Sequence, residues 1–549
     1  LGLGNLSRTD LILDDGGTPW FVDVNVVPGM TETSLLPLAA TQATPVRWAR
    51  SADPATLDPH AVNVGLNFNL LHQMYEPLVI RLADNSLQGA LAESWKQTDD
   101  PSVWAFKLRP GVKFHDGTPL TAADVVFSLK RAQAPSSQMK SLLSSVREVV
   151  AVDPLTVHIR THGPDLILPD NLTNLFIMSE AWTRAHQAEA PQDTASKSEN
   201  YATRHVNGTG PYTLVSREVD SRTVMKLNPT YWGKGQFPLQ VTELTYVPIK
   251  SPATRVAALL SGEIDFLQDV PAQDVARLKS NANLKVASGL ENRTIFLGLD
   301  VGSAKLRHSS VTDRNPLADA RVREALALAI DRDAIQKAVM RGLSSPTGML
   351  AAPFVNGYTK ALAAYPKADP ARARKLLAEA GYPEGFTLTL DAPNDRYVND
   401  EAIATAVAGF LARIGVKVTV QARPFALHNA LLTKGDSDFY LYGWGVPTHD
   451  SAYVFDYLVH TRGKNRLGTW NITGYSNPQL DAQIESLSSE GNRDKRNATI
   501  QSIWEATRQA GFYIPLHDQM ISNASIPSLD VPIHPNNITY FKLVKVKKP

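Results

Sequence analysis

The chain has 549 residues, a formal net charge of +1 and no cysteine. Its length favours more than one domain, and its near-neutral charge gives no sign of a nucleic-acid groove or a polybasic membrane contact. The lack of cysteine excludes disulfides, thiol catalysis and thiolate zinc sites, and no apolar run reaches the ~18 residues of a membrane span.

The first segment of the chain predicts a β-hairpin. Leu11–Leu13 and Trp20–Val24 are two short apolar runs, and Asp15-Gly16-Gly17 between them is typical of a turn. The next stretch is Asn25-Val26-Val27-Pro28-Gly29-Met30-Thr31-Glu32-Thr33-Ser34-Leu35. Together with Arg8, Asp10 and Asp23 it resembles the C-terminal end of D-alanine–D-alanine ligases, which usually have Glu where Asp23 stands. In that family these acidic and amide groups hold magnesium against ATP phosphates.

The ligase resemblance covers only residues 1–40, and these residues include none of the part that binds ATP in such a ligase, so we expect no ligase function. We therefore interpret residues 1–43 as a remnant or fusion segment. The alternative is an enzymatic function, in which this segment retains D-alanine–D-alanine ligase activity. The segment has no basic region followed by an apolar core, so it is not a signal peptide as written. Small residues at 39–43 are consistent with the remains of a cleavage region. We expect the native protein to carry a signal peptide that this chain lacks and to be periplasmic.

From residue 44 onward the pattern is mixed α/β. Trp104, Phe106 and Leu108 alternate with polar or small residues as in a strand. Thr121 and Asp124 have the spacing of a capping box and predict the start of a helix.

The clearest local architecture lies between Asp369 and Val420. Asp369 followed by Pro370 predicts a helix start, and Gly381 predicts its end. Residues 386–390 alternate as a strand, residues 403–414 have one apolar helix face, and 416–420 alternate again. This strand–helix–strand unit predicts a parallel sheet with right-handed crossovers. A further strand at 438–444 ends in the loop 445–450, and ligands of open α/β sheets gather at such strand ends.

Five stretches, in order, resemble the peptide/nickel class of solute-binding proteins of ABC importers. They are Leu91–Trp95 with Phe106–Gly117 and Thr121–Val125, Gly208–Tyr212 with Asn228–Gly233, Leu260–Asp265, Asp319–Arg323 with Ala329–Arg332, and Phe512–His517. The resemblance covers residues 44–549. It implies an α/β, two-lobed periplasmic-binding-protein fold with an extra subdomain in the first lobe.

The same resemblance implies domain boundaries. We expect the first lobe to comprise residues 44–296 plus 515–549, with a subdomain at about 86–206, and the second lobe to comprise 297–514. The two crossings between the lobes are expected near Thr294–Leu297 and near Ile514.

Asp450 is the leading candidate for ligand binding. It resembles the aspartate that pairs with a peptide's terminal ammonium in the dipeptide and oligopeptide branch. An ammonium stripped of water inside a closed cleft needs a carboxylate and fixed acceptors. The alternative is a loop aspartate that caps a helix at 451–458, and one residue could do both.

The other candidates lie around the same strand ends. Trp444 offers a flat apolar wall or is simply core, and Gly445 allows close approach of the backbone or only serves the turn. Arg396, with the neighbouring Tyr397, could hold a peptide carboxylate; the alternative is an ion pair with Asp395 or Asp400. Tyr75 is a weaker first-lobe candidate, and its surroundings favour a core position over a ligand contact.

His449 lies beside Asp450 and could face the cleft, but the histidines form no H-E-x-x-H or H-x-x-E-H cluster, so we expect no metal. The sequence has no G-x-S-x-G elbow and no P-loop, so we expect no enzymatic activity and no cofactor. The expected partners are a peptide or peptide-like solute and the membrane subunits of an ABC importer, with no nucleic acid; a monomer is expected. The alternatives within the class are a nickel-chelate, glutathione or sugar carrier.

Overall fold

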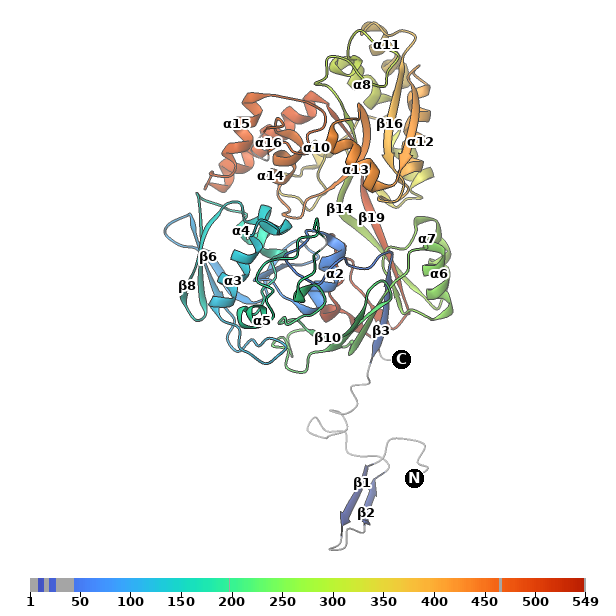
Figure 1. Cartoon of the computed structure of the whole chain (residues 1–549). Coiled ribbons are helices and arrows are strands. Elements are labelled where there is room, and N and C mark those ends of the chain that lie inside the picture. Colours follow the sequence, from blue (N-terminus) through green and yellow to red (C-terminus); the bar gives the residue numbers. More distant parts are fainter. Residues whose placement is uncertain (1–7, 14–18, 26–43, 197, 464–466, 548–549) are drawn as a thin grey trace.

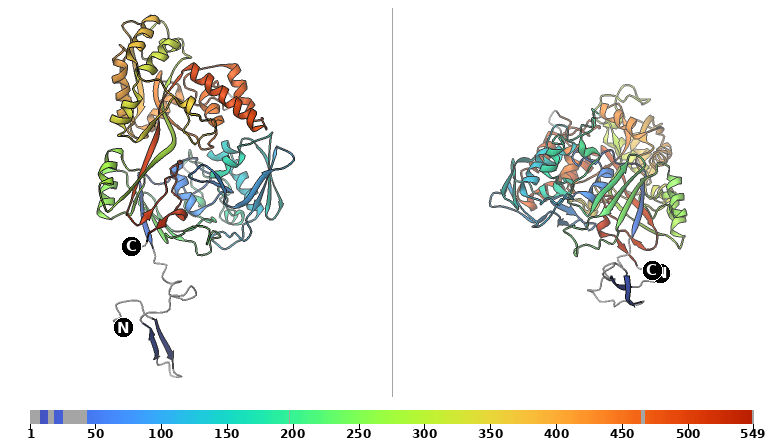
Figure 2. Two further views of the ribbon diagram at one scale, coloured as in Figure 1. Left: turned by 180° about the vertical axis from the view of Figure 1, so that it is seen from behind. Right: turned by 60° about the horizontal axis from the view of Figure 1, so that its bottom comes forward.

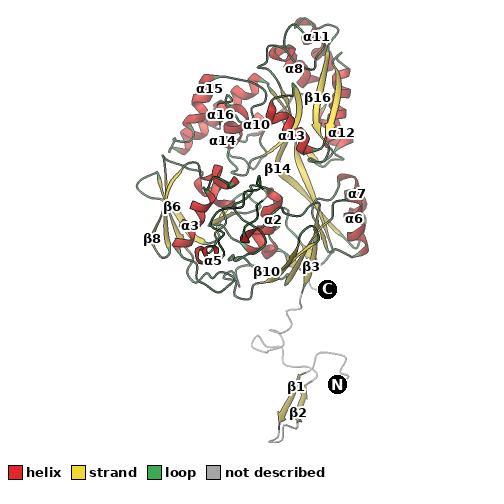
Figure 3. Cartoon of the chain, in the orientation of Figure 1, coloured by secondary structure: helices red, strands yellow, loops and turns green. Residues whose placement is uncertain are grey.

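The computed structural model describes residues 8–13, 19–25, 44–196, 198–463 and 467–547, and the body from residue 44 forms two lobes (Figure 1). Two long strands join the lobes, β14 (Lys285–Leu299) and β19 (Tyr513–Ser525), and they pair with each other in antiparallel fashion. Figure 2, seen from behind, shows both strands passing from one lobe into the other. Figure 3 shows helices flanking the strands in both lobes. None of the helices within the described ranges has the length and apolar character to cross a membrane.

The first lobe holds one half of an 11-stranded sheet, in the order β10-β11-β12-β3-β13-β19. Strands β12 and β13 both run parallel to β3, and helix α6 connects them. Ser251 caps α6 through a bond from Thr254 N, and Gly262 ends it in a left-handed conformation, which glycine adopts without strain. The elements are β3 (Pro45–Arg50), α2 (Gly65–Met74), β10 (Tyr212–Glu218), β11 (Arg222–Leu227), β12 (Glu243–Pro248), α6 (Pro252–Ser261), β13 (Phe266–Leu267) and α7 (Ala272–Lys279).

A separate four-stranded sheet, in the order β6-β7-β9-β8, extends the first lobe. Helix α3 begins with the predicted capping box, in which Asp124 accepts from both the backbone and the hydroxyl of Thr121 at 2.9 Å. The predicted strand at 104–108 is confirmed as β7. The elements are β6 (Ala92–Gln97), β7 (Val103–Leu108), α3 (Ala122–Ala132), β8 (Val146–Asp153), β9 (Thr156–Thr161), α4 (Leu168–Asn171) and α5 (Glu180–Ala185); β4 (Val79–Arg81) and β5 (Leu87–Gly89) pair beside it.

The second lobe continues the large sheet in the order β19-β14-β18-β16-β17. β16 and β17 are parallel, which confirms the predicted strand–helix–strand unit. Asp369 accepts from Arg372 N at 2.9 Å at the start of α11, as predicted. The elements are α8 (Ala320–Ala329), α9 (Arg332–Ala334), β15 (Ser344–Pro346), α10 (Lys360–Ala363), α11 (Pro370–Glu379), β16 (Thr387–Pro393), α12 (Asp400–Ala412), β17 (Lys417–Arg423), α13 (Phe425–Lys434), β18 (Phe439–Gly445), α14 (Ser451–Val454), α15 (Pro478–Ser486) and α16 (Arg493–Ala510).

The chain returns to the first lobe after β19, where β20 (Leu529–Asp530) pairs with β21 (Lys545–Val546). This tail is fixed by a buried ion pair between Lys542 and Glu76 at 3.1 Å. The proposed boundary at 296/297 falls inside β14 and that at 514/515 inside β19. The exact division into lobes stays a prediction.

The predicted N-terminal hairpin is present: β1 (Arg8–Leu13) and β2 (Pro19–Asn25) form a two-stranded antiparallel sheet of their own. Its predicted turn, at 15–17, lies outside the described residues. Figure 1 draws the hairpin apart from the lobes. The body begins at Thr44, whose backbone N–H donates to Thr242 Oγ1 at 2.8 Å.

Deleting residues 1–43 is expected to leave the melting temperature within about one or two degrees, because the family resemblance of the body begins at residue 44 and the described strands of the segment, β1 and β2, pair only with each other. Differential scanning calorimetry of the full and shortened chains measures this. A loss of several degrees would show that the hairpin packs on the body.

Candidate functional site

A cavity of about 330 Å³ lies between the lobes, where the carboxyl ends of β16 and β18 meet the crossing strand β14. It is lined from the first lobe by Asn63, Phe68, Asn174, Asn536 and Ile538, from β14 by Glu291, Asn292 and Arg293, and from the second lobe by Arg396, Tyr397, Phe425, Tyr442, Trp444 and Gly445, among others. Four of the seven predicted site residues therefore line one cavity: Trp444, Gly445, Arg396 and Tyr397.

The crossing strand builds one wall of this cavity through an irregularity. β14 pairs with β19 up to Leu290, opposite Met520, and again from Thr294, opposite Asp518. The register shift leaves Glu291–Arg293 unpaired with β19, although Arg293 still pairs with Gly445 of β18, and all three polar residues line the cavity. The side chain of Glu291 accepts from Gln519 Nε2 at 2.5 Å, which fixes it to the second crossing strand.

Two arginines give the cavity a positive wall. Arg293 lies 3.1 Å from Glu291 and therefore has a counter-charge. The Arg396 guanidinium lies over the rings of Phe425 (5.2 Å) and Tyr397 (5.8 Å) and forms no ion pair with any described residue. Desolvation by the surrounding protein and the nearby Arg293 lower the pKa of Arg396 from its ordinary value, while the residue as a whole remains exposed to solvent.

The two carboxylates that the sequence offers as alternative partners of the Arg396 side chain are engaged elsewhere. Asp395 accepts from Phe425 N at 2.7 Å, at the start of α13. Asp400 accepts from the backbone N–H groups of Arg396 and Tyr397, both at 3.0 Å. These bonds hold the loop so that the guanidinium is left free of a carboxylate at the cavity.

Aromatic side chains form the rest of the second-lobe wall. Trp444 contacts Tyr442, Tyr453 and Trp470, with ring centroids 5.9 to 6.5 Å apart. Tyr397 donates its hydroxyl to Gly443 O at 3.1 Å. A Cβ at Gly443 would lie 2.7 Å from the Tyr397 ring, so the glycine is needed for this close packing. At Gly445 an added Cβ would lie 3.0 Å from Asn292 O.

Asp450 lies just behind this wall and is fully engaged within the second lobe. It caps α14 by accepting from Ala452 N at 3.0 Å, which confirms the capping interpretation. It also forms a bidentate ion pair with Arg496 at 2.7 and 2.8 Å and accepts from Asn356 Nδ2 at 3.0 Å. Burial alone would raise the pKa of Asp450, but Arg496 holds it below its usual value. A contact with a ligand ammonium stays a prediction, and this arrangement disfavours it because Arg496 already neutralises the carboxylate.

His449 lies at the interface of the lobes rather than in the cavity. Its Nε2 is 2.9 Å from Asn536 Oδ1, in the C-terminal tail, and 3.1 Å from Asn292 Nδ2, on β14. Burial lowers the pKa of His449 to about 3, so its ring is neutral at physiological pH. No group of three or more metal-binding side chains occurs in the part of the chain that the structure describes.

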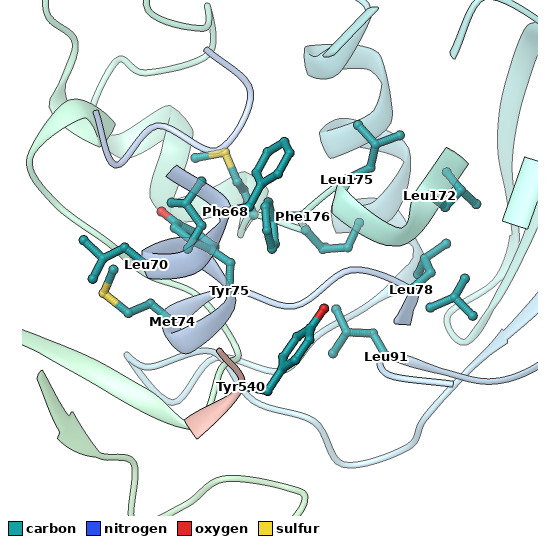
Figure 4. Close-up of a cluster of buried hydrophobic side chains, with 14 of the residues drawn as sticks. Phe68, Leu70, Met74, Tyr75, Leu78, Leu91, Leu172, Leu175, Phe176 and Tyr540 are labelled. Atoms are coloured by element: carbon teal, nitrogen blue, oxygen red, sulfur yellow. The ribbon is translucent and has the colours of Figure 1, made fainter. Parts of the chain in front are cut away.

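The structure places Tyr75 in the core, which is the interpretation that the sequence favoured over a ligand contact. Its side chain is completely buried in the core of the first lobe, where Figure 4 shows it among Phe68, Met74 and Phe176. Tyr75 follows directly after α2 and packs among apolar neighbours of this core, so it does not line the cavity.

Several cavity residues were missed from the sequence. Glu291, Asn292 and Arg293 interrupt the apolar end of a long strand, and this polar triplet is the only local signal that they carry. Phe425 and Asn536 have no local sequence signal of this kind, because only the tertiary fold brings them to the cavity.

Comparison with known proteins identifies the family to which this architecture belongs. Residues 86–466 match the family model of bacterial extracellular solute-binding proteins, family 5 Middle, and residues 1–45 match that of the D-ala D-ala ligase C-terminus. Both resemblances expected from the sequence are thereby confirmed. The glutathione-binding protein GsiB of Pectobacterium atrosepticum is 30% identical over 465 residues, which cover 81% of this chain and 84% of that protein.

Solved structures show the same fold. The periplasmic binding protein DppA of Helicobacter pylori, in complex with peptide STSA, has a TM-score of 0.74 at 21% identity and covers 92% of this chain and 98% of its own. The substrate-binding protein CtaP of Listeria monocytogenes has a TM-score of 0.79 at 19% identity, with 92% and 100% covered. These similarities confirm the predicted two-lobed α/β fold. The chain belongs to the bacterial extracellular solute-binding proteins of family 5, which serve ABC importers.

Proposed function

We propose that this chain captures short peptides or peptide-like solutes in the cavity between its lobes and delivers them to the membrane subunits of an ABC importer outside the cytoplasm. Closure of two lobes over a solute, hinged at β14 and β19, would supply the affinity. Binding without chemical conversion is the proposed activity.

The observation that carries the proposal is the guanidinium of Arg396. It lies at a cavity between two lobes, against the faces of Phe425 and Tyr397, and has no carboxylate partner among the described residues. A guanidinium in this setting is suited to a bidentate bond with a carboxylate. Aromatic faces beside it suit the apolar parts of a peptide.

Glutathione is a specific candidate within this proposal. It has two carboxylates, and the cavity presents the guanidinium of Arg396, which has no carboxylate partner among the described residues, beside that of Arg293, which is paired with Glu291. The relatives named as glutathione-binding proteins support its inclusion. A thermal-shift screen of glutathione, di- and tripeptides, amino acids, sugars and a nickel–histidine chelate, each followed by calorimetry, tests the proposal. Binding of sugars alone, with no peptide bound, would contradict it.

Replacing Arg396 with glutamine is expected to weaken binding of a free-carboxylate peptide about 10- to 100-fold, since a hydrogen bond to a charged group contributes ~1.5–3 kcal/mol. The same peptide with an amidated C-terminus should bind wild type and Arg396→Gln almost equally. Isothermal titration calorimetry of both peptides measures this. Arg413→Gln, an exposed arginine whose guanidinium lies over Phe410, is the control and should bind like wild type.

A further inference from the structure

A second cavity of about 360 Å³ lies between the lobes, next to the first. Tyr453 lines both cavities, so its ring is part of the partition between them. The first-lobe subdomain supplies Asp165, and the second lobe supplies Asp456, Tyr457, Glu485 and Arg496. A solute that occupies the first cavity could therefore extend past Tyr453 into the second.

Asp456 is the unusual group in this second cavity. It lies in a π-helical turn, Phe455–Val459, that continues α14. Its side chain is half-buried, and no described residue donates a hydrogen bond to its carboxylate or forms an ion pair with it. The charged groups that act on it from a distance are His460, Asp450 and Arg496.

Of the other charged side chains of this cavity, Arg496 and Glu485 each have a partner of opposite charge or a histidine, whereas Asp165 has only neutral hydrogen-bond donors. Arg496 is neutralised by its bidentate pair with Asp450. Glu485 lies 3.0 Å from His460 Nε2. Asp165 accepts from Ser145 Oγ at 2.6 Å and from Ile167 N at 2.9 Å, and neither of these donors carries a charge. Two carboxylates, Asp165 and Asp456, therefore remain without a positive partner among the described residues.

The aromatic wall adds an attraction for cations. The Tyr453 and Tyr457 rings are 4.7 Å apart, and the Trp444 ring lies 5.9 Å from the first and 5.8 Å from the second. The faces of tyrosine and tryptophan rings attract an ammonium or guanidinium group. Burial also raises the pKa of Asp456 to about 7 and raises that of Asp165, as expected of carboxylates that lack a cation.

We propose that the second cavity binds a protonated amine or guanidinium group of the solute, with Asp456 as its direct partner, Tyr453 and Tyr457 beside it, and Asp165 adding negative charge from the opposite lobe. This inference rests on the proposed function, because it assigns the positive end of a solute whose carboxylate lies at Arg396. A solute held in this way touches both lobes and stabilises their closed arrangement.

The test uses the full chain and four variants: Asp456→Asn, Asp165→Asn, Glu485→Gln and Arg396→Gln. The probes are glutathione and trialanine, each with a free and an N-acetylated amino group, and agmatine, which has a guanidinium and an amine but no carboxylate. Calorimetry gives the dissociation constants. Glu485→Gln is the matched control, because its carboxylate lines the same cavity but is already paired with His460.

Wild type should bind the free-amine form of at least one peptide ten times or more tightly than its acetylated form. Asp456→Asn should lose most of this preference, Asp165→Asn a smaller part, and Glu485→Gln none. The melting temperature of ligand-free Asp456→Asn should equal or exceed that of wild type, because the substitution removes an unpaired carboxylate. A damaged fold would instead lower it.

An unchanged preference for the free amine in Asp456→Asn overturns the inference. If Arg396→Gln weakens peptide binding while Asp456→Asn does not, the proposed function stands and the second cavity has no such role. If no peptide binds wild type but agmatine binds in an Asp456-dependent manner, the cavity assignment stands and the proposed function falls. If neither agmatine nor any peptide binding depends on Asp456, the cavity assignment is wrong.

Discussion

Replacing Arg496 with methionine is expected to lower the stability of the second lobe by about 3–5 kcal/mol, the usual cost of breaking a buried ion pair. The side chains of Arg496 and Asp450 are only 5% and 4% exposed, and they form two parallel hydrogen bonds at 2.7 and 2.8 Å. Without Arg496, the carboxylate of Asp450 would remain buried with only Asn356 and Ala452 N as donors. Calorimetry and urea denaturation of the ligand-free protein measure the loss.

Two variants make this result interpretable. Arg372→Met breaks the surface pair of Arg372 and Glu324, whose side chains are 59% and 48% exposed, and should change stability by less than about 1 kcal/mol. The double variant Asp450→Asn/Arg496→Met should recover part of the loss, because no unpaired charge stays buried. Stability of Arg496→Met equal to that of wild type would contradict the structural role of the pair.

The same pair decides between the two interpretations of Asp450. If it is structural, Asp450→Asn lowers stability and weakens binding of free and N-acetylated peptides to the same extent. A selective loss for the free amine, with little loss of stability, would restore the predicted contact with a ligand ammonium.

Replacing Asp518 with asparagine is expected to make the protein more stable than wild type above pH 8. Asp518 lies on β19, is 2% exposed, and accepts from Thr294 Oγ1 of the other crossing strand at 2.6 Å. Burial raises its pKa to about 8. An aspartate in the unfolded chain has a pKa of about 3.9. Between about pH 4 and pH 8, Asp518 therefore keeps its proton in the folded protein but has released it in the unfolded chain.

Stability must therefore fall as pH rises between the two pKa values, by at most about 1.4 kcal/mol per pH unit, and this contribution becomes constant above the folded value. The amide introduced by Asp518→Asn would keep an acceptor for Thr294 but has no proton to lose. The difference in melting temperature between Asp518→Asn and wild type should grow from pH 5 to pH 8 and then level off.

Asp84→Asn is the control for this titration, since Asp84 is exposed and its pKa is lowered by hydrogen bonds from Ser86, so its difference from wild type should stay almost constant from pH 5 upward. A difference between Asp518→Asn and wild type that does not vary with pH would show that Asp518 has an ordinary pKa.

Local signals in the sequence predicted the elements well where both ends are marked by their own residues. Asp369 and Pro370 start α11, the capping box of Thr121 and Asp124 starts α3, and the alternation after residue 386 gives β16. The parallel pairing of β16 and β17 followed because a helix separates two strands.

Only those residues of the candidate site that lie at the carboxyl ends of predicted strands could be predicted from the sequence. Trp444 lies at the carboxyl end of β18 and Arg396 follows β16, and the carboxyl ends of these neighbouring strands meet at the cavity. The partner of Asp450 could not be predicted, because Arg496 lies 46 residues further along the chain on a helix with no motif. The wall formed by Glu291–Arg293 depends on a register shift that pairing creates, and strand alternation does not reveal it.

The irregular part of β14 has a consequence for how affinity can evolve. Glu291–Arg293 line the cavity and also lie where the chain crosses between the lobes. Under the proposed function, the same three residues would take part both in lobe closure and in contact with a solute. The apparent dissociation constant includes the fraction of molecules already closed. A substitution on the buried side of the crossing strands, such as at Thr294, can therefore tighten or loosen binding of every solute by a common factor while the order of preference among solutes stays the same.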